Sequence, residues 1–256
     1  MVTVLNFDGS YENQSFYRHT AYQWIDCSNV KNVNGYCAPE SLAEIRKKLQ
    51  ERSSNGITFI GSGNYHYVTY LLLSEISVPF TLVLFDYHTD AMPGLYGCSL
   101  LSCGSWVLHA LENLPLMQRV VMLGVNREWA AVMPRFYAAR VTFFTEDQIN
   151  SENEFKNQLL TAIPTGAVYI SIDKDVLSSA EAMTNWEQGT MTLQEMLDIA
   201  IEIGSRRMIR GFDVCGEYAV TAATEFLPEC RHATARNNRA NRIILDMALN
   251  MKPVRN

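Results

Sequence analysis

The residues with the clearest chemical potential follow an apolar segment in the first half of the chain. In the sequence LVLFDYHTD, residues 82–90, the polar residues Asp86, His88 and Asp90 occupy alternate positions directly after the apolar run. Side chains at alternate positions of an extended backbone point to the same side, so these three would lie together. Carboxylates gathered at the end of a buried strand repel one another and lose solvation unless a cation neutralises them. The pattern therefore predicts a metal site rather than an ion-pairing loop, because no basic residue lies nearby.

A second apolar segment ends in a similar way. The sequence AVYISIDKDVL, residues 167–177, places Asp173 and Asp175 at alternate positions, with Lys174 pointing away from them. A single aspartate at a strand end is commonly a turn or cap residue. Two aspartates in this pattern, in a chain that already carries the first motif, favour a role as further metal ligands.

Two weaker signals follow other strand-like segments. The turn GSGN, residues 61–64, ends one such segment, and His66 follows it. A single histidine is more often structural, but its place at a third strand end makes it a candidate ligand. Glu217 follows the segment that ends at Asp213. It either holds a cationic group of a substrate above the metals or is an ordinary surface glutamate.

The candidate ligands combine two imidazoles with four carboxylates, namely His66, Asp86, His88, Asp90, Asp173 and Asp175. Oxygen-rich sets without thiolate suit Mn²⁺ or other first-row divalent ions better than a cysteine-type zinc site. Six such ligands can hold two metals, and two metals about 3.5–4 Å apart can activate a shared water at neutral pH. We therefore expect a binuclear, hydrolytic metal centre.

These residues require elements that bring their strand ends together. Short apolar segments alternate with segments at helical spacing, which predicts right-handed βαβ crossovers, and strands that are apolar throughout are typical of a parallel sheet covered on both faces. The expected strands are Thr3–Phe7, Ile57–Gly61, Thr81–Asp86, Arg119–Gly124, Val141–Phe144, Ala167–Asp173 and Arg207–Asp213. The expected helices are Pro39–Glu51, Gly104–Asn113, Asn153–Ile163, Thr192–Ile203 and Asn237–Met251.

The expected fold is therefore α/β, with three layers (α-β-α) around a mostly parallel, doubly wound sheet. No repeat or linker divides the 256 residues, so one domain spanning residues 1–256 is expected. In open α/β sheets the ligand site lies at the carboxyl ends of the strands, where the candidate ligands fall. Two long polar stretches without periodicity, residues 91–102 and 177–190, also follow strand ends and are expected to be functional loops.

Composition excludes several classes of partner. The formal net charge is -6 and no run of Lys or Arg stands out, whereas nucleic-acid binding needs a concentrated basic face. No apolar stretch reaches the roughly 18–20 residues that span a bilayer, and the first residues lack the features of a signal peptide. We therefore expect a cytoplasmic protein that binds neither nucleic acid nor membrane. The 6 cysteines form no C-x-x-C pair, so most are expected to be small buried residues.

The motifs occur in a recognisable order: a Gly-rich turn with a histidine, D-x-H-x-D, S-x-D-x-D and a D-V-x-x-E-like strand end. This order resembles the motif set of the arginase, agmatinase and formiminoglutamase superfamily, from about Gly61 to Glu217. The resemblance implies that one manganese ion is held by His66, Asp86, Asp90 and Asp173, and a second by Asp86, His88, Asp173 and Asp175. It also implies that a hydroxide between the metals attacks a guanidinium or amidine-type carbon. Glu217 would match the glutamate that binds the guanidinium. Oligomers are common in this superfamily, which leaves a homo-oligomer open here.

The chain also departs from the family pattern. Tyr65 stands where the family turn has an aspartate, and Gly216 is inserted before Glu217. Cys103 falls where arginases place a proton-shuttling histidine, and Met92 replaces the residue on the α-carboxylate side of the substrate. These differences argue against an arginase.

Three hypotheses for the function remain open from the sequence. The first is a binuclear manganese hydrolase that cleaves a C–N bond of a small guanidino, formimino or related amidine-type molecule, with Asp90, Cys103 and Glu217 as its catalytic residues. The second is a metal-binding protein without catalytic activity. The third is a deacetylase-type amide hydrolase on the same scaffold.

Overall fold

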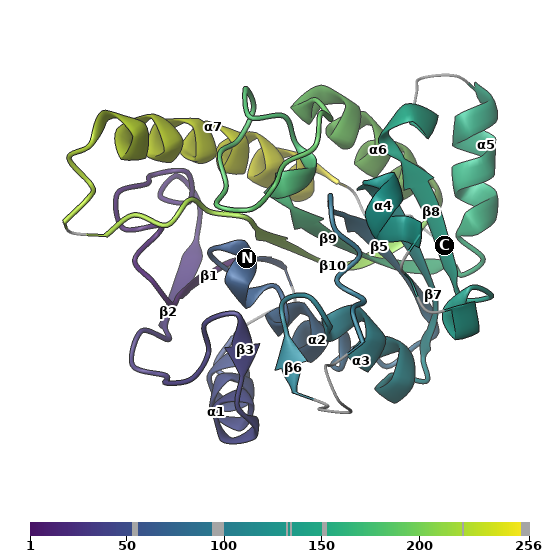
Figure 1. Ribbon diagram of the computed structural model, residues 1–256, viewed down its shortest axis with the longest axis horizontal. Coiled ribbons are helices and arrows are strands. Elements are labelled where there is room, and N and C mark those ends of the chain that lie inside the picture. Colours follow the sequence, from purple (N-terminus) through teal and green to yellow (C-terminus); the bar gives the residue numbers. More distant parts are fainter. Residues whose placement is uncertain are drawn as a thin grey trace.

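A parallel sheet forms the centre of the molecule (Figure 1). The computed structural model describes residues 1–52, 56–93, 100–131, 133, 135–149, 153–221 and 223–251. The sheet strands are β1 (Val2–Asn6), β2 (Tyr22–Asp26), β4 (Ile57–Phe59), β5 (Phe80–Phe85), β7 (Met117–Val125), β8 (Val141–Thr145), β9 (Ala167–Asp173) and β10 (Met208–Cys215). Their order is β2-β1-β4-β10-β9-β5-β7-β8, and every neighbouring pair is parallel.

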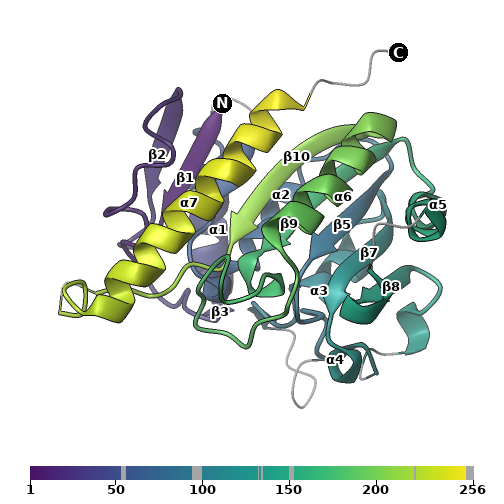
Figure 2. The same cartoon turned by 90° about the horizontal axis from the view of Figure 1, so that it is seen from above.

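Helices cover both faces of this sheet, which confirms the three-layer arrangement expected from the sequence. One face carries α1 (Pro39–Leu49), α2 (Val68–Leu73) and α3 (Trp106–Asn113). The other carries α5 (Asn153–Ala162), α6 (Leu193–Arg206) and α7 (Pro228–Asn250), and Figure 2 shows α6 and α7 side by side along the strands. A short antiparallel pair, β3 (Tyr36–Cys37) and β6 (Leu101–Ser102), and the short helix α4 (Arg127–Ala131) lie outside the main sheet. Within the described ranges, no helix has both the length and the apolar character to cross a membrane.

Two hydrophobic cores lie on opposite faces of the sheet, and β5 contributes to both. Leu82 and Leu84 pack into the core beneath α1, α2 and α3, whereas Val83 and Phe85 pack into the core beneath α5, α6 and α7. Because both faces of β5 are buried, the strand is apolar except for Thr81 near its start. The next polar residue, Asp86, appears only where the strand ends, and this is where the D-x-H-x-D motif begins.

The starts of two helices show where the local sequence predicts a helix boundary and where it does not. Thr192 caps α6 and forms a reciprocal capping box with Glu195, so the helix begins within one residue of its expected start. The expected start of the last helix at Asn237 is wrong, since α7 begins at Pro228. Proline suits the first helical turn, but the residues that this first part of α7 buries include the small Cys230 and Ala233. Such small side chains produce no apolar periodicity from which this part of the helix could be predicted.

Gly124 gives a test of the backbone geometry at the carboxyl end of β7. Its φ is +88°, and a Cβ there would lie 2.3 Å from Cγ2 of Val176. We expect Gly124→Ala to lower the free energy of unfolding by about 2 kcal/mol or more, because strain and overlap add. Gly166→Ala is the control, since nothing lies within 4 Å of a Cβ at that position. Urea unfolding of both variants measures the difference, and equal losses would contradict this account.

Candidate metal centre

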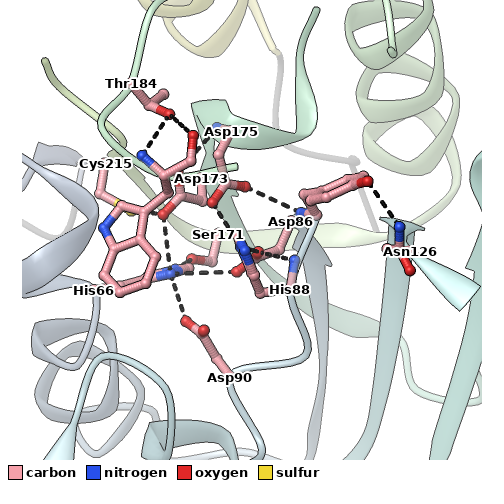
Figure 3. A network of polar contacts seen from close by, with 12 residues as sticks. His66, Asp86, His88, Asp90, Asn126, Ser171, Asp173, Asp175, Thr184 and Cys215 are labelled. Carbon is pink, nitrogen blue, oxygen red and sulfur yellow. Dashed lines mark hydrogen bonds and ion pairs between the residues drawn. The ribbon is translucent and has the colours of Figure 1, made fainter. Parts of the chain in front are cut away.

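The candidate ligands come from strands that are neighbours in the sheet. β4, β10, β9 and β5 lie side by side, and Asp86 and Asp173 stand at the carboxyl ends of β5 and β9. His66 follows β4 through the short turn Gly63–Tyr65. Figure 3 shows the six predicted ligands pointing toward one another at this edge of the sheet.

The first group of ligands surrounds the ring of His66. Its Nδ1 lies 2.9 Å from Oδ2 of Asp90, 3.4 Å from Oδ2 of Asp86 and 3.5 Å from Oδ2 of Asp173. All four side chains are buried. His66, Asp86 and Asp90 each offer one ligand atom within 4.8 Å of the others, so this group can hold one ion.

The second group lies beside the first and shares one residue with it. Nδ1 of His88 lies 2.9 Å from Oδ2 of Asp175 and 3.6 Å from Oδ1 of Asp86. Asp86, His88 and Asp175 again offer ligand atoms within 4.8 Å of one another. Asp86 therefore directs one oxygen to each group, as a bridging carboxylate does. The resemblance also assigned Asp173 to both ions; the structure groups it with His66, and its role as a ligand of the second ion stays a prediction.

Hydrogen bonds from the backbone and from one indole fix the carboxylates in place. The backbone N–H of Tyr87 donates to Oδ1 of Asp175 at 3.0 Å, and that of His88 donates to Oδ1 of Asp86 at 2.6 Å. Nε1 of Trp106 donates to Oδ2 of Asp90 at 2.6 Å. Asp90 itself adopts a φ of 48°, a conformation that aspartate tolerates better than most residues. The loop is thus bent so that Asp90 returns to the cluster.

A relay behind His66 determines which ring nitrogen carries the proton. Oγ of Ser171 donates to Oδ1 of Asp213 at 2.7 Å and lies 3.0 Å from Nε2 of His66. Since the single hydroxyl proton of Ser171 points to Asp213, the oxygen accepts from Nε2–H of His66. In its neutral form, which metal binding requires, the imidazole therefore directs a lone pair of Nδ1 into the cluster. Histidine ligands of metals are commonly oriented by a partner of this kind.

Two buried polar atoms test whether a metal fits this donor set. Among the described residues, Nδ1 of His66 and Oδ2 of Asp86 have no hydrogen-bond partner. Nδ1 lies only 2.9 Å from Oδ2 of Asp90, but the two atoms are not aligned as donor and acceptor. Leaving a buried polar group without a partner costs roughly 1–3 kcal/mol. A cation between these lone pairs would satisfy all of them, so the residues fit a divalent metal.

The pKa values of the cluster show how strongly it attracts positive charge. Burial raises the pKa of Asp86 well above its usual range, and the charges of Asp90 and Asp175 add to this effect. Burial alone would lower the pKa of His66, but the neighbouring carboxylates outweigh it and raise the pKa to about 10. Protons and divalent cations therefore compete for the same positions.

A cavity of about 640 Å³ opens onto the two ligand groups. His88, Asp90, Asp173 and Asp175 lie at its base, and its walls include Tyr36, Met92, Cys103, Trp129, Trp186 and Glu187. The walls include parts of both loops that the sequence singled out, although residues 94–99 of the first loop lie outside the described residues. The site is thus a cluster of candidate metal ligands that opens into a pocket whose walls include the aromatic side chains of Tyr36, Trp129 and Trp186.

Cys103, the expected substitute for a shuttle histidine, does line this cavity. Burial raises the pKa of its thiol to about 12, with a further contribution from the charge of Asp90. Without a cation in the cluster the thiol is therefore neutral. His109 lies on α3 against the ring of Tyr70, with ring centroids 6.5 Å apart, and does not line the cavity.

Glu217, the expected guanidinium ligand, does not line the cavity. It is buried and accepts hydrogen bonds from Lys174, Gln14, Asn237 and Asn241. Both of its oxygens are engaged by these donors, so the substrate-binding role expected from the resemblance does not fit the structure. Lys174 was correctly expected to point away from the aspartates, but its buried partner was not foreseen.

Comparison with known proteins decides the family. A sequence model of the arginase family matches residues 4–225. The chain belongs to the arginase family. It is also 32% identical over 216 residues to an uncharacterised protein of Thermotoga maritima, a match that covers 84% of this chain and 79% of the relative.

Solved structures with the same fold are more distant in sequence. An arginase from Bacillus cereus has a TM-score of 0.65 at 13% identity, with 99% of each chain covered. A formimidoylglutamase from Bacillus subtilis has a TM-score of 0.64 at 15% identity, and the match covers 96% of this chain and 86% of that one. At such identities the likeness establishes only the fold of this arginase-family member. Its substrate has to be inferred from the residues of its own site.

The relay behind His66 gives a direct test of the metal centre. We expect Ser171→Ala to weaken divalent-metal binding by roughly 10–100-fold, as loss of an outer partner of a ligand typically does. Ser41→Ala is the matched control, because Ser41 is also a buried serine but donates to the carbonyl of Lys31, away from the cluster. Competition with a metal-binding dye measures both affinities. Equal affinities in the two variants would contradict the relay.

Proposed function

We propose that this protein is a binuclear, Mn²⁺-dependent hydrolase that cleaves a C–N bond of a small guanidino, formimino or related amidine-type molecule. The observation that carries this proposal is the pair of ligand groups that share Asp86 beneath a cavity. Membership of the arginase family supports the same class of chemistry. The oxygen-rich donor set favours manganese among the first-row ions.

The residues of the site have distinct roles in this proposal. Two divalent ions in such a site lower the pKa of a water and supply a nucleophile at neutral pH. Asp86 holds the two ligand groups together, and the hydrogen bond from Trp106 orients Asp90 toward the first group. Cys103 faces the cavity and is the available proton-transfer group on this wall. The walls of Trp129 and Trp186 shield the reacting centre from bulk water.

The cavity walls also restrict the substrate. Among the described residues that line the cavity there is no Lys or Arg, and the sequence of residues 94–99, GLYGCS, adds none. A carboxylate on the substrate would therefore lack a cationic partner. Aromatic faces of Trp129 and Trp186, together with the carboxylate of Glu187, suit a cationic or apolar substituent instead. This favours amidine-type substrates without a carboxylate.

Metal stoichiometry gives the first test of the proposed function. We expect the Mn²⁺-loaded protein to hold two ions per chain, and Asp86→Ala to lose both ions and all measurable hydrolysis, since Asp86 serves both groups. Asp147→Ala is the control, because this carboxylate pairs with Arg127 on the surface. Elemental analysis and a screen of guanidino and formimino compounds provide the readouts. A fully loaded protein that hydrolyses no member of the screen would overturn the proposal.

The substrate screen also tests the role of the cavity walls. We expect a guanidino-alkylamine without a carboxylate to exceed arginine in kcat/KM by about tenfold or more, which corresponds to about 1.4 kcal/mol. The reason is that an α-carboxylate would be desolvated without a cationic partner. Parallel steady-state assays of the two compounds measure this ratio. A preference for arginine would show that a cation outside the described lining residues serves the carboxylate.

An amide hydrolase of the deacetylase type is the alternative on this scaffold. The observation that favours it is the absence of Glu217 from the cavity, since an amide carbonyl, unlike a guanidinium, needs no carboxylate partner. Acetylated polyamines included in the same screen distinguish the two reactions.

A further inference from the structure

Cys215 lies next to the first ligand group, although its position in the sequence does not indicate a role there. It ends β10, is fully buried and pairs with Asp173 in the register of β10 and β9. Its thiol donates to Oδ2 of Asp173 at 3.1 Å. The same oxygen lies 3.5 Å from Nδ1 of His66, so the sulfur meets the cluster at an atom that faces the first metal position.

The side chains of His66, Asp173 and Cys215 lie close enough together to coordinate one ion. His66, Asp173 and Cys215 each offer one ligand atom, and these atoms lie within 4.8 Å of one another. Nδ1 of His66 is buried and, among the described residues, has no hydrogen-bond partner. In the neutral ring, the proton on Nε2 leaves the lone pair of Nδ1 directed into the cluster. The thiol is thus one member of a set that already points to a cation.

The backbone after Cys215 keeps the sulfur close to this set. Gly216 has a φ of +86°, and a Cβ there would lie 2.5 Å from Oδ1 of Asp173 and 2.7 Å from the backbone nitrogen of Lys174. The end of β10 therefore packs directly against the segment that carries Asp173. Only glycine permits this approach, which leaves Cys215 little freedom to move away from the carboxylate.

From this geometry we infer that Cys215 supplies a sulfur ligand to the ion held by His66 and Asp173. Binding replaces the S–H bond by a metal–sulfur bond and releases one proton to solvent, with no transfer of electrons. The second group, with His88 and Asp175, contains only nitrogen and oxygen. The two positions then differ in softness, so the first binds Zn²⁺ or Co²⁺ more tightly than the second does, while both can still hold Mn²⁺. This inference rests on the metal centre of the proposed function but not on its substrate.

X-ray absorption at the zinc edge tests the inference on the wild-type full chain loaded with one equivalent of Zn²⁺. We expect a sulfur neighbour at about 2.3 Å, the usual zinc–thiolate distance. A shell of nitrogen and oxygen alone would overturn the sulfur ligand while leaving the metal centre intact. A protein that binds no divalent ion would overturn the metal centre as well, so the two failures are distinguishable.

Cysteine variants identify which sulfur is bound. With Co²⁺, we expect the sulfur-to-cobalt charge-transfer absorption to be lost in Cys215→Ser and retained in Cys103→Ser and Cys230→Ser. Cys230 is the matched control, since it is also buried but lies on α7. Cys215→Ser should also bind Zn²⁺ at least tenfold more weakly while its affinity for Mn²⁺ changes little. Loss of the absorption in Cys103→Ser instead would assign the sulfur to Cys103 and overturn the inference.

Discussion

The buried carboxylates at the sheet edge impose the main physical constraint on this molecule. Asp86, Asp90, Asp173 and Asp175 are all buried within one cluster. Carboxylates this close together, and out of contact with water, cannot all carry charge unless cations lie among them. The apolar strands that end at this edge bring the four carboxylates together in a buried position. The fold therefore creates a site whose charge must be balanced by protons or by divalent ions, and the choice between them depends on pH and metal supply.

The segment of residues 173–175 also contains a buried charge that is neutralised without any metal. Asp173 and Asp175 face the ligand cluster, whereas Lys174 between them points to the opposite side and pairs with Glu217. Asn241 contacts both members of this pair. Removal of one partner of a buried ion pair typically costs about 3–5 kcal/mol. The turn that carries two of the candidate metal ligands is thus stabilised from its other side by an ion pair within the protein.

Local alternation in the sequence was sufficient to predict which side chains the structure brings together as candidate ligands, because the first polar residues after an apolar strand stand out. It could not identify Ser171 or Cys215 as members of the site. Their roles depend on the register of β9 against β10, which is a property of two segments far apart in the chain. Glu217 was misassigned for a related reason. The backbone turns at Gly216 with a positive φ, and this turn carries the glutamate to Lys174 instead of to the cavity.

In this protein, one part of the structure positions the ligand cluster and another part determines the choice of substrate. The candidate ligands lie at or just after the carboxyl ends of neighbouring strands, whose spacing is set by backbone hydrogen bonds, so a distant relative can keep the same cluster. The cavity walls come from loops and short elements, such as Met92 and the region around Trp129 and Trp186. Loops accept substitutions that strands do not. A change of substrate can therefore occur around an unchanged metal site, and the aromatic wall without Lys or Arg among its described residues is the feature from which the substrate of this chain is best inferred.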